Sequence, residues 1–316
     1  MTRKTTAWLI HDGARGNAVQ CDGLAASLGI DARTLIVDPP APYSWAAPWG
    51  PAAPNPAFCP PWPDLAFAAC RQAVPYLSRL AKTGTFTVYL KNPGINPAKF
   101  DLVWAPDHDR LAGENVISTA VSPHTLTAEK LSAAAQDFAA PLKTLPARRL
   151  GVAIGGNNGV FTLGAAEIDR LAADLTRLSK RHGIGFIVTP SRRTGKDNIV
   201  RLQAALAHLP AFVWDMEGAN PYPALLALSD WLLVSCDSVN MVGEATFSGK
   251  PVYMLPLPGG SAKFSRFHNA LIASGAVRWF EGELNSWPYP PQDATQTIAN
   301  RIRANFEAKT GHKIIV

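Results

Sequence analysis

The chain lacks the cysteine spacings that bind zinc or carry redox chemistry. Its four cysteines, Cys21, Cys59, Cys70 and Cys236, are scattered over 316 residues and form no CxxC pair. We therefore expect reduced thiols and no metal site. Reduced thiols are typical of the cytoplasm or of the cytoplasmic face of a membrane.

Long apolar runs are also missing. No uncharged stretch approaches the roughly 20 apolar residues that a membrane-spanning helix needs. The first residues, MTRKTTAWLIHDG, hold an apolar run only at 7–10, and no cleavage pattern follows. This beginning does not resemble a signal peptide, so we expect a cytoplasmic protein, either free or peripheral at a membrane.

Charged residues are few, at 17%, against 47% hydrophobic residues, and the formal net charge is +6. This composition is typical of an α/β protein with buried strands. No dense Lys/Arg tract is present, so we expect no nucleic-acid partner, whereas the positive balance favours anionic ligands or a membrane surface. A length of 316 residues exceeds one ordinary core and predicts two domains.

The stretch at residues 229–258 is the clearest structural signal that the chain does contain. It predicts a strand at 231–234, a turn with Asp237 and Ser238, a helix at 239–248 and a second strand at 252–255. A helix that begins directly after a strand presents free N–H groups suited to a diphosphate. Glu244 on that helix could bind ribose hydroxyls, although a plain capped helix with a surface Glu fits equally.

The first half predicts a doubly wound domain. Its expected strands are at 5–10, 34–37, 85–90, 100–105 and 116–120, with helices at 18–28, 64–82 and 127–139. Candidate side chains follow two of the strands. His11 and Asp12 lie in the first glycine-containing turn, and His108 lies in an Asp-His-Asp run. Each could act as acid or base, but a purely structural network around His108 is an equal alternative.

Residues 38–63 are rich in proline and tryptophan, which excludes regular helix or central strand. One interpretation is an irregular loop anchored by buried aromatic side chains. The alternative is an exposed aromatic lip for a lipid or a membrane interface. We favour the buried interpretation, because long loops are often anchored in this way.

The second half repeats the pattern of a strand followed by a polar turn. Expected strands at 149–154, 184–189, 211–214 and 231–234 alternate with helices at 165–182, 223–228 and 292–308, and residues 258–268 are expected to form a mobile basic loop. The fingerprint GxGxxG is absent. The turns still supply backbone donors, amides and arginines, the groups that bind phosphate.

Because the carboxyl ends of parallel strands share one edge, these turns should converge on one nucleotide diphosphate. The expected ligand-binding residues are Gly155, Gly156, Asn157, Asn158, Ser191, Arg192, Arg193, Thr194, Asp237, Ser238, Val239, Glu244 and Lys263.

Several motifs give the chain a family resemblance. Glu244-Ala245 followed by Gly249-Lys250-Pro251 resembles the E-A-x-x-x-G-x-P element of GT-B nucleotide-sugar glycosyltransferases. The whole chain is similar to the mitochondrial-fission ELM (elongated mitochondria) family. The matching pieces are Asp12-Gly13 with Gly16 and Gln20, 100–103 with 106–109, Gly113 with Asn115-Val116, 155–159, 191–194, 237–239 with 241–242 and 244–245, and Lys263-Phe264.

The resemblance implies two Rossmann-like doubly wound α/β domains facing a cleft. We expect an N-terminal acceptor domain at 1–145 and a nucleotide-sugar domain at 146–316, with the last helix crossing back to the first domain. In the superfamily the Glu binds ribose and the turn before its helix binds the diphosphate. Family members often carry a His in the turn that corresponds to residues 16–20. This chain has no His there, so His11, Asp12 and His108 are the candidates for a base.

The leading hypothesis is a metal-independent glycosyltransferase that takes a nucleoside-diphosphate sugar and an unknown acceptor, lipid-linked or glycan. The alternative is a non-catalytic or membrane-associated adaptor on the same fold. A sugar-nucleotide epimerase or dehydrogenase is a weaker third reading, since neither GxGxxG nor a Tyr-x-x-x-Lys pair is present.

Overall fold

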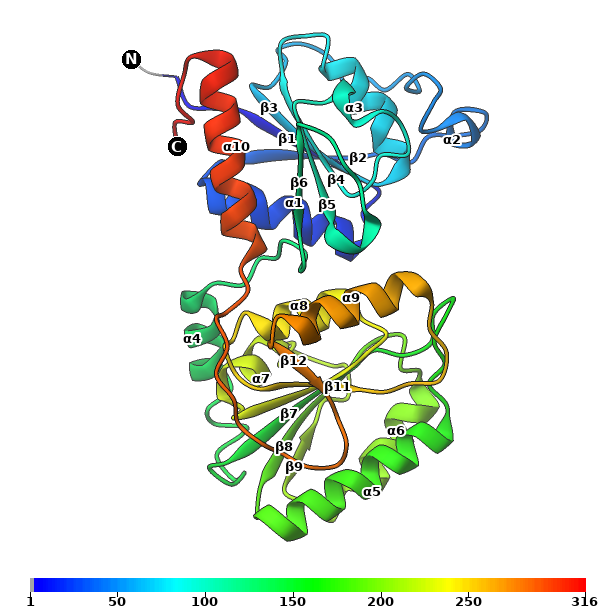
Figure 1. The fold of residues 1–316 in the computed structure, drawn as a ribbon, viewed down its shortest axis with the longest axis vertical. Helices are drawn as coiled ribbons and strands as arrows, with labels where there is room; N and C mark the ends of the chain where they lie inside the picture. The colour runs from blue at the N-terminus through cyan, green and yellow to red at the C-terminus, as the bar shows by residue number, and fades with distance from the viewer. Residues whose placement is uncertain (1–2) are drawn as a thin grey trace. The chain divides into compact units, whose positions relative to one another are not determined.

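A computed structural model describes residues 3–316 of the chain, which divide into two units. The first unit runs up to Thr125 and resumes at Asp293–Val316, and the second is Leu126–Gln292. Each unit contains one six-stranded sheet whose strand pairs are all parallel (Figure 1). The expected boundary at 145 differs from this division, because α4 (Ala128–Asp137) packs against α7 (Tyr222–Leu228) of the second unit.

The first sheet has the strand order β2-β1-β3-β4-β5-β6. Its elements are β1 (Ala7–His11), α1 (Arg15–Leu28), β2 (Ala32–Ile36), α2 (Tyr43–Ala46), β3 (Leu65–Ala69), η1 (Arg71–Ala73), α3 (Val74–Leu80), β4 (Phe86–Leu90), η2 (Pro97–Lys99), β5 (Leu102–Pro106), η3 (Asp107–Asp109), β6 (Val116–Thr119) and α10 (Ala294–Thr310). The order reverses between β1 and β3, so the topological switch point of this sheet lies there.

The expected helix at 64–82 is wrong in its first part. Residues Leu65–Ala69 form β3, which pairs with β1 on one side and β4 on the other. Alanine-rich LAFAA favours helix by propensity. Its burial pattern is that of a central strand covered on both faces, and small side chains leave room for the helices above and below.

The proline-rich segment divides into a buried half and an exposed half. Phe58 packs against Trp8 and Tyr76, with ring centroids 5.7 and 4.5 Å apart, and it is 2% exposed. Trp62 also packs on Trp8. These rings anchor the segment on the face of the sheet that α3 covers, as the buried interpretation predicts for this half. The other half, around α2, carries the exposed side chains of Trp45 and Trp49 and is described below.

Helix α10 belongs to the first unit, where it lies beside α1 (Figure 1). Its first turn is fixed by Thr295, whose hydroxyl accepts from His124 N–H at 2.9 Å and donates to the His124 carbonyl at 3.1 Å. On α1, Gly23 faces the same carbonyl so closely that a Cβ there would come within 2.3 Å of it. Close backbone packing therefore holds α1 and residue 124 together, while Thr295 holds α10 to residue 124.

The second sheet has the order β12-β11-β10-β7-β8-β9. Its unit contains α4, β7 (Arg149–Ile154), α5 (Ala165–His182), β8 (Gly185–Pro190), α6 (Lys196–Leu206), β9 (Ala211–Val213), α7, β10 (Trp231–Ser235), α8 (Val239–Thr246), β11 (Val252–Leu255), α9 (Ala262–Ala273) and β12 (Val277–Trp279). From β7, strands β8 and β9 follow toward one edge of the sheet, while β10, β11 and β12 follow toward the other edge. The switch point therefore lies between β7 and β10.

The expected mobile loop at 258–268 is mostly helix. Helix α9 starts at Ala262, and the Ser261 side chain caps it by accepting from Phe264 N–H. The sequence signal for this start is Ser261, which directly follows the pair Gly259-Gly260, because Ser is a preferred N-cap residue. The basic residues of this stretch therefore lie on an ordered helix, packed by a Phe161–Phe264 ring contact at 4.8 Å.

Candidate functional site

The loops after β7 and β10 meet at the switch point of the second sheet. Gly155 N–H donates to the Ser235 hydroxyl at 2.7 Å, and Gly156 N–H donates to the Asp237 carboxylate at 3.1 Å. The Asn158 side-chain amide donates to the Asp237 carbonyl at 3.3 Å. The structure thus brings together the glycine turn and the turn before α8, although these are about 80 residues apart in the sequence.

Asp237 is the centre of this network. Its side chain is fully buried, and Oδ2 accepts from Gly156 N–H and from Arg193 Nη1 at 2.6 Å. The other oxygen, Oδ1, is buried without a hydrogen-bond partner among the described residues. A buried carboxylate requires a compensating charge, and Arg193 supplies it.

The loop after β8 closes over the glycine turn. The Ser191 hydroxyl donates to the Gly155 carbonyl at 2.7 Å, and the Thr194 hydroxyl donates to the same oxygen at 2.6 Å. Gly156 has φ +150°, and a Cβ there would come within 2.0 Å of the Arg193 carbonyl. Glycine is therefore required at position 156 by close backbone approach as well as by φ.

Two asparagines of the turn hold its own backbone. Asn158 Oδ1 accepts from the N–H groups of Val160 and Phe161, each at 2.8 Å, and Asn157 Oδ1 accepts from Leu163 N–H at 2.7 Å. Their side-chain oxygens therefore shape the loop, as capping side chains do in turns.

Adjacent arginines have different surroundings. Arg193 is ion-paired with buried Asp237, so its charge is balanced inside the protein. Arg192 is exposed and makes no ion pair among residues 3–316. Of the two arginines expected to bind phosphate, Arg192 is the one whose charge the network does not already compensate.

Helix α8 begins beside this network. Ser238 is its N-cap and accepts from Met241 N–H, and Val239 is the first helical residue. Farther along, Glu244 lies beside Tyr222. Burial raises the pKa of Tyr222 well above its usual value, and the Glu244 carboxylate and its hydrogen bond add to the rise. Tyr222 therefore stays protonated, and its hydroxyl, which donates to the Met241 carbonyl at 3.3 Å, also lies within reach of the Glu244 carboxylate.

Lys250, part of the element that resembles the glycosyltransferase motif, has a structural position. Its ammonium donates to the carbonyls of Leu226 and Ala227 at the end of α7. Cations stabilise helix C-termini in this way. Burial lowers the pKa of Lys250 to about 8.

His268 also helps to build the site, although the sequence analysis does not select it as a site residue. It is 4% exposed on α9, and its Nε2 lies 2.8 Å from the carbonyl oxygen of Cys236. Nε2 must carry the proton to make this bond, and burial lowers the pKa of His268, so the ring is neutral at neutral pH. The expected ligand residue Lys263 lies in the first turn of the same helix.

The candidate bases of the first unit fall into two places. His11 is the last residue of β1 and Asp12 follows it, whereas His108 follows β5, three strand spacings or roughly 14 Å along the sheet edge. His11 is 3% exposed and accepts Gly13 N–H at Nδ1. His108 is 6% exposed, with Nε2 3.8 Å from Asp109 Oδ1.

Asp12 is the exposed member of the three. Partial burial alone would raise its pKa, but hydrogen bonds from Asn17 and Ala14 N–H outweigh burial and lower the pKa of Asp12. It is therefore ionised at neutral pH and can accept a hydrogen bond.

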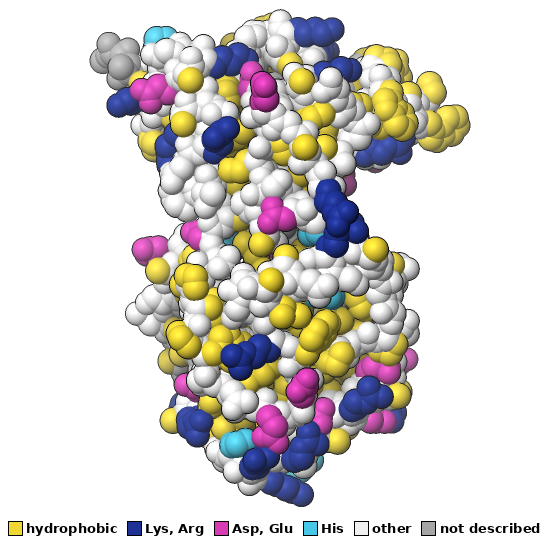
Figure 2. Space-filling model, in the orientation of Figure 1, with side chains coloured by type: hydrophobic (Ala, Val, Ile, Leu, Met, Phe, Trp, Pro, Cys, Tyr) yellow, Lys and Arg dark blue, Asp and Glu magenta, His cyan; other side chains and the backbone are white. Residues whose placement is uncertain are grey.

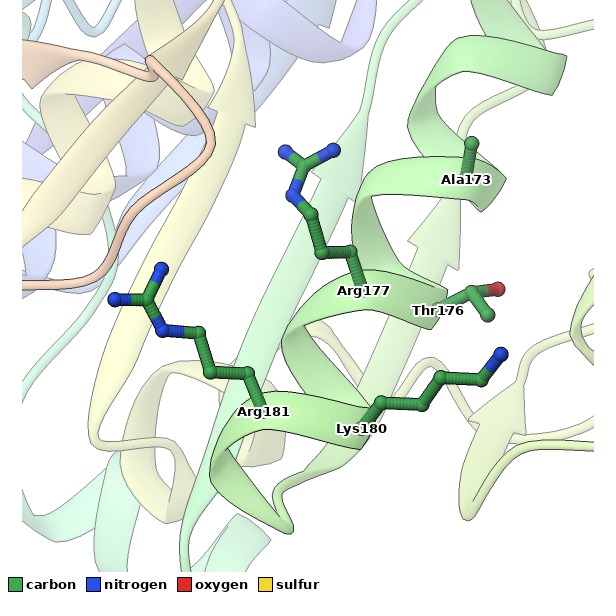
Figure 3. A pocket seen from close by; sticks show the side chains of 5 residues that line it. All are labelled: Ala173, Thr176, Arg177, Lys180 and Arg181. Carbon is green, nitrogen blue, oxygen red and sulfur yellow. The ribbon is translucent and has the colours of Figure 1, made fainter.

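A surface hollow of about 610 Å³ lies elsewhere in the second unit, along α5 (Figure 3). Arg177 and Arg181 point to one side of the helix there, and Lys180 points to another. Arg181 is paired with Glu283 and Arg177 with Asp174. The hollow is open to solvent and two of its three basic residues are held in ion pairs, so we prefer the switch point as the candidate functional site.

Neither a metal-binding cluster nor a membrane-spanning helix is found among residues 3–316. No cluster of three or more His, Cys, Asp or Glu side chains is arranged to hold a metal ion. No helix in that part of the chain has both the length and the apolar character needed to cross a bilayer.

Solved structures share this two-unit architecture. MurG of Acinetobacter baumannii aligns with a TM-score of 0.51 at 11% identity, covering 98% of this chain and 95% of that one. UDP-GlcNAc 2-epimerase of Methanocaldococcus jannaschii aligns with a TM-score of 0.59 at 9% identity, covering 95% and 99%. The fold is therefore GT-B-like, with two Rossmann-like units, as expected.

Sequence comparison then gives the family. The family model for mitochondrial fission ELM1 matches residues 15–306, so the chain belongs to that family. The mitochondrial fission protein ELM1 of Arabidopsis thaliana is 26% identical over 259 residues, and an uncharacterized protein, RP120, of Rickettsia prowazekii (strain Madrid E) is 27% identical over 162 residues. The alignments cover 74% and 48% of this chain, but 61% and 45% of those relatives.

Proposed function

We propose that the second unit binds a nucleoside-diphosphate sugar at its switch point and that the protein transfers the sugar to an acceptor. The observation that carries the proposal is the meeting of the loops after β7, β8 and β10 beside the N-terminus of α8. In open parallel sheets, ligands bind outside the carboxyl ends of strands at this point. A UDP-GlcNAc 2-epimerase of Methanocaldococcus jannaschii, solved in complex with UDP-GlcNAc and UDP, shares the fold with a TM-score of 0.52.

Different residues take different roles in the proposed site. Arg192 and the N–H groups at the start of α8 would bind the diphosphate, and Glu244, beside Tyr222, would accept hydrogen bonds from ribose hydroxyls. Arg193 would act indirectly, because its bond to Asp237 holds the glycine turn in place. Lys263 on α9 is a further cation of the second unit.

In the proposed transfer the acceptor oxygen forms a bond to the anomeric carbon while the bond from that carbon to the diphosphate oxygen breaks. The bonding electrons leave with the diphosphate, whose charge Arg192 and the helix N-terminus would stabilise. The acceptor proton passes to a base, for which Asp12, His11 and His108 are the candidates from the first unit. No metal is part of the proposal.

Isothermal titration with UDP- and GDP-sugars tests the proposal directly. We expect one of them to bind the full chain, and Glu244→Gln to weaken its binding about tenfold, because ribose hydroxyls lose a charged acceptor. Arg192→Ala should weaken binding of the diphosphate by a similar factor. Glu283→Gln, a substitution beyond β12 away from the switch point, is the matched control.

A folded protein that binds none of these sugars would contradict the proposal. So would unchanged affinity in both Glu244→Gln and Arg192→Ala, since the ligand would then lie elsewhere.

Epimerisation of a nucleotide sugar is a variant that uses the same site. UDP-GlcNAc 2-epimerases share this fold, so a missing GxGxxG or Tyr-x-x-x-Lys pair does not separate the two reactions. The products do: transfer releases a nucleoside diphosphate, whereas epimerisation leaves the nucleotide sugar intact with altered stereochemistry. Proton NMR of the bound sugar nucleotide after incubation distinguishes them.

The second candidate function is a non-catalytic adaptor with a peripheral membrane contact. Exposure of Trp45 and Trp49, each 75%, favours it. An adaptor would bind no nucleotide sugar and would keep its function in Glu244→Gln, so the same titrations separate it from the leading proposal.

A further inference from the structure

The switch point of the first sheet, between β1 and β3, is lined by titratable side chains, whereas β7 at the switch point of the second sheet is followed by Gly155 and Gly156. The residues that leave β1 are His11 and Asp12, and those that leave β3 are Cys70 and Arg71. Lys91 follows the next strand, β4. All five lie at the carboxyl edge of one parallel sheet, where open α/β sheets bind ligands.

A chain of hydrogen bonds links three of these loops and helices. The Lys91 ammonium donates to Asn17 Oδ1 at 2.5 Å, and Asn17 Nδ2 donates to Asp12 Oδ1 at 2.9 Å. An ammonium has three N–H donors. The arrangement joins a cation and an ionised carboxylate through one side-chain amide, which suits a ligand carrying both an anionic group and a hydroxyl.

Two residues at this edge carry side chains although their backbone conformations favour glycine. Cys70 has φ 106° and ψ 155°, a region that is essentially restricted to glycine, and Lys91 has φ +88°. Tyr89 at the end of β4 donates its hydroxyl to the Cys70 carbonyl at 3.0 Å and holds that conformation. Strained non-glycine residues at two neighbouring strand ends are typical of functional sites.

An apolar surface adjoins the same edge. Residues 39–63 contain no charged side chain, and Trp45 and Trp49 in their exposed half are each 75% exposed. Hydrophobic side chains gather at the end of the first unit where α2 lies, with Lys or Arg side chains beside them (Figures 1 and 2). We call Trp45 and Trp49 the tryptophan lip.

Printed contacts connect the tryptophan lip to the polar edge. Exposed Arg71 donates from Nη2 to the Trp45 carbonyl at 2.9 Å. In the loop after Lys91, a Cβ on Gly94 would meet Pro48 at 3.4 Å, so that loop packs against the segment carrying the lip. The lip, Arg71 and the Lys91 loop therefore form one surface of the first unit.

We propose that this surface docks on a bilayer containing anionic, hydroxyl-bearing phospholipids. Trp45 and Trp49 enter the headgroup–acyl boundary, Arg71 and Lys91 bind the lipid phosphate, and Asp12 accepts a hydrogen bond from a headgroup hydroxyl. The proposal deepens the peripheral membrane contact of the second candidate function, and it does not require the nucleotide-sugar site.

The chemistry of the surface favours lipid over a protein groove. Tryptophan is enriched at membrane interfaces, where one end of the ring contacts an apolar region and the other end contacts water. A cation near an anionic leaflet gains electrostatic attraction, and Arg71 is exposed next to the lip. Among the described tryptophans of the first unit, only Trp45 and Trp49 expose more than half of their surface.

Vesicle flotation with the full chain tests the proposal. We expect binding to phosphatidylcholine vesicles that contain phosphatidylglycerol, and weak binding to phosphatidylcholine alone. The Trp45→Ala/Trp49→Ala double variant should lose at least about tenfold in vesicle affinity, because two large apolar side chains no longer enter the interface. Arg71→Ala should lose about fivefold and reduce the dependence on salt.

Trp279→Ala, which removes a 38% exposed tryptophan of the second unit, is the matched control and should bind vesicles as the wild type does. Negligible binding to both vesicle types would overturn the proposal, as would equal binding of the wild type and the double variant. Circular dichroism confirms that each variant is folded. Nucleotide-sugar titration of the same preparations is scored separately, so failure of one proposal is distinguishable from failure of the other.

Discussion

The two sheets of this protein have the same number of parallel strands and one switch point each, but their carboxyl edges are built differently. In the second sheet, Gly155 and Gly156 pack directly on Asp237, and the chain's own carboxylate fills the space between the strands. In the first sheet, the equivalent edge holds Cys70 and Lys91 in conformations that glycine would adopt more readily.

This difference indicates two kinds of recognition. The N–H groups of Gly155 and Gly156 are already donated to Ser235 and Asp237, so the groups proposed to bind phosphate at this edge are Arg192 and the N–H groups at the start of α8. An edge with charged side chains on strained backbone presents an ammonium and a carboxylate, which suit a ligand with mixed polarity. The comparison is therefore consistent with a nucleotide on one unit and an amphiphile on the other.

The largest expected effect comes from adding a side chain to the glycine-lined edge. Gly156→Ala should reduce the free energy of unfolding of the second unit by about 3 kcal/mol, because its Cβ meets the Arg193 carbonyl and its φ is unfavourable for alanine. Urea denaturation measures the change. Gly159→Ala, in the same loop with nothing within 4 Å of its Cβ, should have little effect. Equal stability of the two variants would show that the loop is not closely packed.

Removing the partner of the buried carboxylate should have the next largest effect. Arg193→Ala leaves the Asp237 carboxylate without a compensating charge and should lower the free energy of unfolding by about 2 kcal/mol. This is less than the loss typical of a fully buried ion pair, because the Arg193 side chain is 39% exposed. Arg192→Ala, the neighbouring exposed arginine, should change the free energy of unfolding by less than about 0.5 kcal/mol. Thermal or urea unfolding compares them, and a similar loss in both would contradict the division of roles between the two arginines.

The smallest effect should be a gain in the first unit. Cys70→Gly should raise the free energy of unfolding by about 1 kcal/mol, since relief of a glycine-only conformation outweighs the extra entropy of an unfolded glycine. Urea denaturation measures it, with Cys59→Gly at an exposed position as the control. A destabilised Cys70→Gly variant would mean that the thiol's packing, and not backbone strain, dominates at this position.

Much of the architecture could be predicted from strand-and-turn patterns. Strand β11 (Val252–Leu255) and the switch from β10 into α8 follow directly from apolar runs and capping residues. Strand β3 could not be predicted, because LAFAA has the composition of a helix and only pairing on both sides selects the extended form. The start of α9 differs from the loop expected at 258–268, because Gly259 and Gly260 favour a loop while Ser261 caps a helix directly after them.

Contacts within the candidate site were predictable only in part. Parallel topology predicts that 155–159, 191–194 and 237–238 share an edge, and the hydrogen bonds among them agree with that geometry. Nothing in the sequence distinguishes Arg192 from Arg193, since their difference depends on which one reaches Asp237. The role of His268 could not be predicted from the sequence either, because its hydrogen bond to Cys236 joins residues 32 positions apart.

The return of α10 to the first unit has a consequence for synthesis on the ribosome. The chain emerges from its N-terminus, so the second unit, Leu126–Gln292, is complete before the helix that covers α1 has been made. Until Thr295 reaches His124, the nascent first unit exposes one apolar flank. We therefore expect the inserted unit to mature first, and the earlier-translated one to wait for its closing helix.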